Sequence, residues 1–175
     1  MARSKSLWVP VLVGCLVAVL LGPAGGGAGA VEPRTVTASI MISDAAFSTN
    51  NDVFDYAKGS AIQALSGSPN FAAPLSFPVP VVSIRKITLY AYDSDPGKNV
   101  CVRLYRSRPA DGTANHLGVV CTVDTTADPQ TAYTTEISPR QVNTAFHGPM
   151  LMLYLSAPGV KFYGVKITYT YETGA

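Results

Sequence analysis

Two aspartates in the middle of the sequence have the types and spacing suited to chemistry. Asp93 and Asp95 lie in the segment 93–98, together with a Pro-Gly pair. Two carboxylates can act in general acid–base catalysis or bind Ca²⁺. However, Asp side chains also cap backbone amides, and Pro and Gly favour turns. We favour a turn, because Ca²⁺ usually needs several more oxygen ligands than this segment offers.

The nine tyrosines are the second candidate feature, because exposed aromatic rings can stack on sugars. Tyr90 and Tyr92 alternate with aliphatic residues just before Asp93, and Tyr105 lies on the next predicted strand. Tyrosines also line sheet rims and subunit contacts, where the ring packs and the hydroxyl reaches water. These three tyrosines are therefore candidates for a carbohydrate-binding face or for contacts between copies of the chain, and we favour the contacts.

Other catalytic patterns have little support in the sequence. It contains no Gly-x-Ser-x-Gly motif, and its Ser83-x-x-Lys86 match lies in a predicted strand. His116 and His147 are isolated. We expect no catalytic residue, no metal site and no cofactor. Carboxylates far apart in the sequence could still converge in a glycoside hydrolase or another hydrolase, which we favour least.

Cys101 and Cys121 are the only cysteines outside the N-terminal leader, and we predict that they form a disulfide. The midpoint between them, Asp111, falls inside a polar loop predicted from composition alone. Two strands paired around that loop would therefore bring the cysteines opposite each other. This register sets the other pairs: Val102 with Val120, Arg103 with Val119, Leu104 with Gly118, and Tyr105 with Leu117.

The first 30 residues have the features of a secretory signal peptide. Two basic residues precede an apolar run over 7–21, and Ala28-Gly29-Ala30 is a suitable cleavage motif before Val31. The run is shorter than the roughly 20 residues of a membrane-spanning helix, so we expect a secreted protein with no membrane segment after cleavage. A minor alternative is a lipid anchor on Cys15, because 12–15 resembles a bacterial lipobox.

The remaining residues, 31–175, have the length of a single domain. The leader holds two of the 13 basic residues and none of the 11 acidic ones, so the mature chain has no net charge. Three arginines, at 103, 106 and 108, lie along one predicted strand and at its end. We interpret them as a solvated strand face, and we expect no binding of nucleic acid.

Outside the leader, the pattern indicates an all-β fold. About eight short segments rich in β-branched and aromatic residues are separated by turn residues, which predicts an antiparallel two-sheet β-sandwich or jelly roll. We expect 84–124 to form a three-stranded meander. In its first strand, Ile87, Leu89 and Ala91 share one face, and Tyr90 and Tyr92 share the other. The apolar segment 150–155 is expected to be a central strand.

Three segments, 71–78, 84–93 and 162–169, resemble a group of uncharacterised secreted bacterial β-sandwich proteins. That group pairs an "aPl.lP.Ga.I..l..yy.D" segment with a closing "GvrI.Y" strand. The chain departs from the pattern at 79–81, where it has Val-Pro-Val. The resemblance implies export and a β-sandwich, and it assigns no site.

From these features we expect a secreted, non-catalytic structural or interaction module. Its partner would be a second copy of the chain or an extracellular glycan or protein. The alternative is a carbohydrate-binding module that uses the tyrosines near 93–97.

Overall fold

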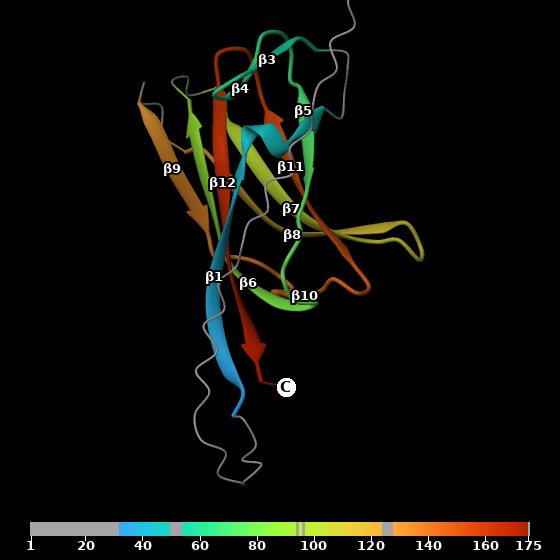
Figure 1. Cartoon of the computed structure of the whole chain (residues 1–175). Helices are drawn as coiled ribbons and strands as arrows, with labels where there is room; N and C mark the ends of the chain where they lie inside the picture. The colour runs from blue at the N-terminus through green and yellow to red at the C-terminus, as the bar shows by residue number, and fades with distance from the viewer. Residues whose placement is uncertain (1–31, 50–53, 94, 96, 124–127, 175) are drawn as a thin grey trace, which may run out of the picture. The chain divides into compact units, whose positions relative to one another are not determined.

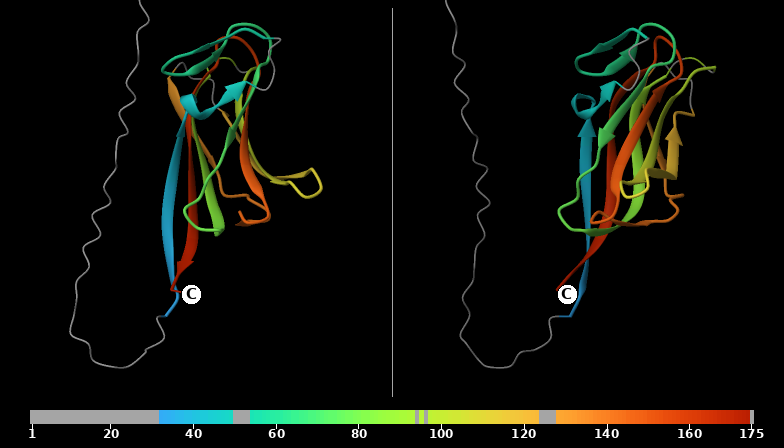
Figure 2. Two further views of the ribbon diagram at one scale, coloured as in Figure 1. Left: turned by 45° about the vertical axis from the view of Figure 1, so that its right-hand side comes forward. Right: turned by 90° about the vertical axis from the view of Figure 1, so that its right-hand side faces the viewer.

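The computed structural model describes residues 32–49, 54–93, 95, 97–123 and 128–174. They form an antiparallel β-sandwich of two sheets, as the sequence predicts, and Figure 1 and Figure 2 show the two layers. The expected leader, with Cys15 and the cleavage site at Ala28, Ala30 and Val31, lies outside the described residues. Among the described residues, no helix has the length and hydropathy to span a membrane.

The larger sheet has seven strands, with β6 and β12 at its centre. β6 pairs with β12, β9 and β10, and β12 pairs with β1 and β4, which in turn pairs with β3. Figure 1 shows the long β1–β12 ladder running past the other strands. The strands of this sheet are β1 (Arg34–Ser43), β3 (Tyr56–Lys58), β4 (Ile62–Ala64), β6 (Val81–Tyr92), β9 (Pro129–Thr134), β10 (Gln141–Asn143) and β12 (Lys161–Thr173).

The smaller sheet has five strands in the order β2-β5-β11-β7-β8. The expected central strand 150–155 is the middle strand of this sheet, which confirms that prediction. A short 3₁₀ helix, η1 (Asp44–Ala46), leads from the larger sheet into the smaller one. The strands are β2 (Ser48–Thr49), β5 (Asn70–Pro74), β7 (Val100–Arg108), β8 (Thr113–Cys121) and β11 (Gly148–Leu155).

Aliphatic and aromatic residues of both sheets fill the space between the layers. Ile87, Leu89 and Ala91 of β6 are fully buried there, as their alternation with polar residues predicts. Two edge-to-face ring pairs, Phe47 with Phe162 and Phe77 with Tyr169, each have centroids 4.9 Å apart. Such pairs stabilise the core beyond the burial of their area.

The expected three-stranded meander is wrong, because β6 does not pair with β7. β6 belongs to the seven-stranded sheet and β7 to the five-stranded sheet, so segment 93–99 carries the chain from one layer to the other. Asp95 and Lys98 do make a local turn: the Lys98 amide donates to the Asp95 carbonyl at 3.0 Å. The turn residues are those of a hairpin, but here the turn is part of a crossing between sheets.

Asp93 fixes this crossing from its buried position at the end of β6, where it is 1% exposed. Its Oδ2 accepts a hydrogen bond of 2.7 Å from the Thr122 hydroxyl, just after β8 of the other sheet. Its backbone carbonyl accepts a 2.6 Å bond from Gln130 Nε2 of β9, in its own sheet. The Thr122 hydroxyl also accepts from the Val100 amide at 3.1 Å. Asp93 therefore joins the two sheets.

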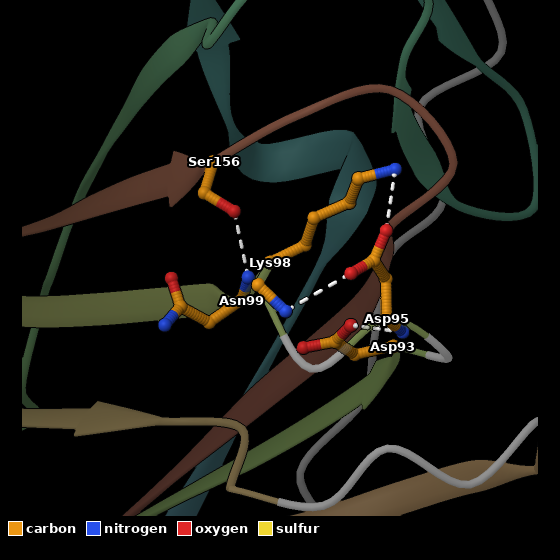
Figure 3. Close-up of polar contacts among 6 residues, drawn as sticks. Asp93, Asp95, Lys98, Asn99 and Ser156 are labelled. Carbon is orange, nitrogen blue, oxygen red and sulfur yellow. Dashed lines mark hydrogen bonds and ion pairs between the residues drawn. The ribbon is translucent and has the colours of Figure 1, made fainter.

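A second contact holds the far end of the crossing, as Figure 3 shows. The Asn99 amide donates to Ser156 Oγ at 2.6 Å, and the Ser156 amide donates to the Asn99 carbonyl at 3.0 Å. Ser156 directly follows β11, so the crossing is attached to the middle strand of the five-stranded sheet. Asp95 Oδ2 is 2.9 Å from Lys98 Nζ, within the turn itself.

The hairpin of β7 and β8 has the register that the cysteines predict, over most of its length. Cys101 lies opposite Cys121, and the bond between them is present. The pairs Val102–Val120, Arg103–Val119 and Leu104–Gly118 also agree. Beyond Leu104 a bulge shifts the register, so Tyr105 lies opposite His116 and not Leu117. The bulge lies beside Gly118, where an added Cβ would meet the Glu136 carbonyl at 2.9 Å.

We expect Asp93→Ala to lower the free energy of unfolding by about 2–3 kcal/mol, because it removes a buried charged acceptor and leaves the donors around it unsatisfied. Urea denaturation measures this loss. The control is Asp95→Ala, two residues away and partly exposed, for which we expect a much smaller loss. Equal losses for the two variants would show that Asp93 does not fix the crossing.

Removing the disulfide is expected to destabilise the fold by about 3 kcal/mol, because the bond closes a loop between residues 20 apart. The comparison is between the wild-type chain and the Cys101→Ala/Cys121→Ala variant in urea without reductant. With reductant, the two proteins should unfold at similar urea concentrations. An identical midpoint without reductant would contradict a stabilising role for the bond.

Candidate functional site

The sheet crossing separates the three tyrosines that the sequence predicts to share one face. Tyr90 and Tyr92 lie on the outer face of the seven-stranded sheet, because their neighbours Leu89 and Ala91 face the core. Tyr105 lies on the outer face of the five-stranded sheet, where it pairs with Met150 and His116. The prediction of one shared face for all three is therefore wrong, and its physical reason is the change of sheet between β6 and β7.

Tyr133, which sequence reasoning missed, joins Tyr90 and Tyr92. It lies on β9 opposite Thr88, and it is 64% exposed. The cross-strand register places the three tyrosines on successive rows of one face, over about 14 Å along the strands. The alternation of Thr131 and Tyr133 with Gln130 and Ala132 was the signal that could have found it, because it marks a half-buried strand.

Lysines lie against these tyrosine rings. Lys86 Nζ is 3.9 Å from the centroid of the Tyr133 ring, and Lys161 Nζ is 5.4 Å from that of Tyr92. Both distances are in the range of cation–π attraction, which holds each ammonium group beside a ring. We call this surface the tyrosine–lysine face; it consists of Lys86, Thr88, Tyr90, Tyr92, Thr131, Tyr133, Lys161 and Lys166.

The side chains of the tyrosine–lysine face pack closely over the sheet. Thr88 lies at its centre, between Tyr133 on β9 and Lys166 on β12. Although Thr88 faces outward, it is only 5% exposed, so its neighbours cover it. Its hydroxyl has no hydrogen-bond partner among the described residues. Next to Tyr90, the partner on β12 is Gly164, which is itself buried, since an added Cβ there would meet the Ile42 carbonyl at 3.1 Å.

Asp93 and Asp95 do not form a paired site. The Asp93 carboxylate turns toward Thr122, and its Oδ1 accepts from the Asp95 amide at 3.2 Å (Figure 3). Asp95 instead accepts from the Gly97 amide at 2.9 Å and contacts Lys98, and these two interactions lower its pKa below the usual range. Both carboxylates thus hold the turn, which is the role we favoured. Among the described residues, no group of three or more His, Cys, Asp or Glu is placed to bind a metal.

The described residues also contain no pair of buried carboxylates of the kind a hydrolase uses. In the part of the chain that the structure describes, Asp93 is the only buried acidic residue. A groove of about 570 Å³ runs beside the edges of β8 and β9, and it is lined by His116, Glu136 and Arg140 among others. Glu136 is exposed there, and the described lining holds no second carboxylate to act with it.

The outer face of the five-stranded sheet has a different character. Met150, Met152 and Tyr154 of β11 point outward, since the leucines between them are buried. The Arg103 guanidinium lies 4.7 Å from the centroid of the Tyr154 ring, and Tyr105 packs edge-to-face with His116 at 5.4 Å. The Tyr105 hydroxyl beside it raises the pKa of Arg103. Tyr154 thus has a cation over its ring, as Tyr133 and Tyr92 do on the other sheet.

Comparisons with known proteins give similarity at the level of the fold. No family model matches the chain, and no curated protein is similar to it in sequence. The C-terminal family 6 carbohydrate-binding module of LamC, a marine laminarinase from Zobellia galactanivorans, has a TM-score of 0.48 and 15% identity. It covers 75% of this chain and 99% of its own. The xylan-binding module of family 15 has a TM-score of 0.48 and 12% identity, and covers 76% of this chain and 97% of its own.

Proposed function

We propose that this chain is an exported, non-catalytic binding module that recognises a polysaccharide through the tyrosine–lysine face. The observation that carries this proposal is the presence of three tyrosines, the exposed Tyr133 and the half-buried Tyr90 and Tyr92, on successive rows of one outer sheet face. The leader-like residues 1–30 and the disulfide support export, because disulfides persist in oxidising compartments.

The chemistry of the face suits a sugar polymer. A pyranose ring has an apolar face of C–H groups, which packs on an aromatic ring, and hydroxyl groups around its edge, which need hydrogen bonds. Tyr133 offers an exposed ring, and the neighbouring Lys86 and Thr131 offer donors. A surface about 14 Å long contacts more than one sugar ring of an extended chain. Binding sites of this kind combine apolar contact with a few placed polar groups.

Tyr90 and Tyr92 are also two of the three tyrosines that we expected to lie at contacts between copies of the chain. A contact between copies would cover the face, whereas a glycan-binding module would leave it open. Light scattering after size exclusion separates the two, because a closed oligomer that Tyr133→Ala breaks into monomers would assign the face to self-association. The structure contains one chain, so self-association stays a prediction.

We expect the Tyr92→Ala/Tyr133→Ala variant to lose polysaccharide binding about tenfold, because it removes the apolar area on which sugars would pack, at about 25 cal/mol per Å² of contact. Binding is measured by affinity electrophoresis against a panel of soluble plant, algal and bacterial polysaccharides. The matched control is Tyr154→Ala, which removes a tyrosine with a cation on its ring from the other sheet. Absence of binding by the wild-type chain, or equal loss in the control, would contradict the proposal.

A further inference from the structure

We infer that the polysaccharide bound by the tyrosine–lysine face is anionic, with carboxylate or sulfate groups along its chain. This inference rests on the proposed function, and it names the chemical class of the ligand. The charged side chains in the rows of this face are lysines, and they are spread along the strands.

Three lysines, Lys86, Lys161 and Lys166, lie on this face among the tyrosines. None of them forms an ion pair with a carboxylate in the part of the chain that the structure describes, where the ion pairs are Lys98–Asp95 and Arg108–Asp111. Arg85 adds a fourth cation next to Lys86 on β6, and its Nε donates to the Thr170 hydroxyl at 3.0 Å. The cations of the face are therefore not neutralised by partners within it.

Among the described residues, the acidic residues that follow or precede these strands lie beyond the rows of the face, including Glu136 two residues after β9 and the buried Asp93 directly after β6. Glu172, near the end of β12, accepts a 2.6 Å hydrogen bond from the Thr35 hydroxyl. Asp128 directly precedes Pro129, which pairs with Tyr92 at the opposite end. Between these ends the rows from Lys86 to Tyr92 hold lysine, threonine and tyrosine without a carboxylate. A ligand that lies across these rows meets positive charge alone.

The positions of the lysines make them suited to a polymer and not to a single anion. Lys166 lies in the row of Tyr133, Lys86 in the row before it, and Lys161 in the row of Tyr92. The ammonium groups are thus distributed along the same direction as the rings. A chain that stacks its sugars on the tyrosines would bring its acidic groups past successive lysines. A compact phosphate site would instead need several donors that converge on one point.

The cation–π contacts place two of the three lysines, Lys86 and Lys161, beside tyrosine rings before any ligand binds. A lysine in water loses considerable side-chain entropy when it is ordered on binding. Lys86 on Tyr133 and Lys161 on Tyr92 have lost part of that freedom in the unbound chain. An ammonium group attracted to the face of a ring still has donors free for a carboxylate or sulfate.

The test compares polymers that share a backbone and differ in charge. Polygalacturonate is compared with its fully methyl-esterified form, and dextran sulfate with dextran, so that the pairs separate carboxylate from sulfate. We expect the wild-type chain to bind at least one anionic form about tenfold more tightly at low salt, and to lose this preference as added salt screens the charges. Binding of both forms with equal affinity would overturn the inference and leave the proposed function standing.

Variants locate the charge effect on the face. Lys86→Gln/Lys166→Gln should lower affinity for the anionic polymer about threefold to tenfold and lower affinity for the neutral one by less, because glutamine keeps hydrogen-bond donors but has no charge. Lys86→Arg/Lys166→Arg should restore most of the preference, which a merely misfolded variant would not do. The matched control, Lys98→Gln, removes a lysine from the 93–99 turn, where it is paired with Asp95.

Three further outcomes are decisive. An equal loss in Lys98→Gln would mean that net charge alone sets the preference, and would overturn the assignment to this face. Equal affinity for single-stranded DNA would overturn recognition of a glycan and replace it with nonspecific attraction to polyanions. If the wild-type chain binds neither the charged nor the neutral polymers, the proposed function fails together with the inference.

Discussion

The buried Asp93 carboxylate is the constraint on which the arrangement of the two sheets depends. A carboxylate is costly to remove from water unless hydrogen bonds replace its hydration. At Asp93 the replacement includes the Thr122 hydroxyl, which comes from the other sheet and also accepts from the first residue of β7. The need to satisfy this one group therefore fixes where the chain leaves one layer and enters the next.

This crossing decides which side chains share a surface. Because β6 ends at Asp93 and β7 begins in the other sheet, β6 pairs with β9 and β12. Those pairings bring Tyr133 and the lysines of β12 alongside Tyr90 and Tyr92. The two outer faces then differ in chemistry: lysine, threonine and tyrosine cover one, and methionine and tyrosine with a single arginine lie on the other. A ligand can distinguish them by charge as well as by shape.

The local features of the fold could be predicted from the sequence because their causes are local. Alternation along β6 separated the buried Leu89 from the outward Tyr90, and the cysteine spacing set the register of the β7–β8 hairpin as far as Leu104. The bulge beyond Leu104 was missed, because it depends on the approach of the Glu136 carbonyl to Gly118, far away in the sequence.

The pairing of β6 could not be predicted in the same way, since a Pro-Gly turn serves a hairpin and a crossing equally well. For this reason, the sequence predicted only part of the candidate site. Tyr90 and Tyr92 were correctly placed on one face, but Tyr105 was assigned to it wrongly, and Tyr133 and Lys161 were absent from the list of candidates. Their proximity depends on pairing between segments far apart in the sequence, as for Tyr92 and Lys161, which are 69 residues apart.

The most direct test of ligand binding on the tyrosine–lysine face is an NMR titration of the ¹⁵N-labelled domain with a short oligogalacturonate, read as amide shifts along the chain. We expect the shifts to concentrate in β6, β9 and β12, from Lys86 to Tyr92, around Tyr133 and from Lys161 to Thr168. Shifts concentrated in β7, β8 and β11 would place the ligand on the opposite sheet and contradict this expectation.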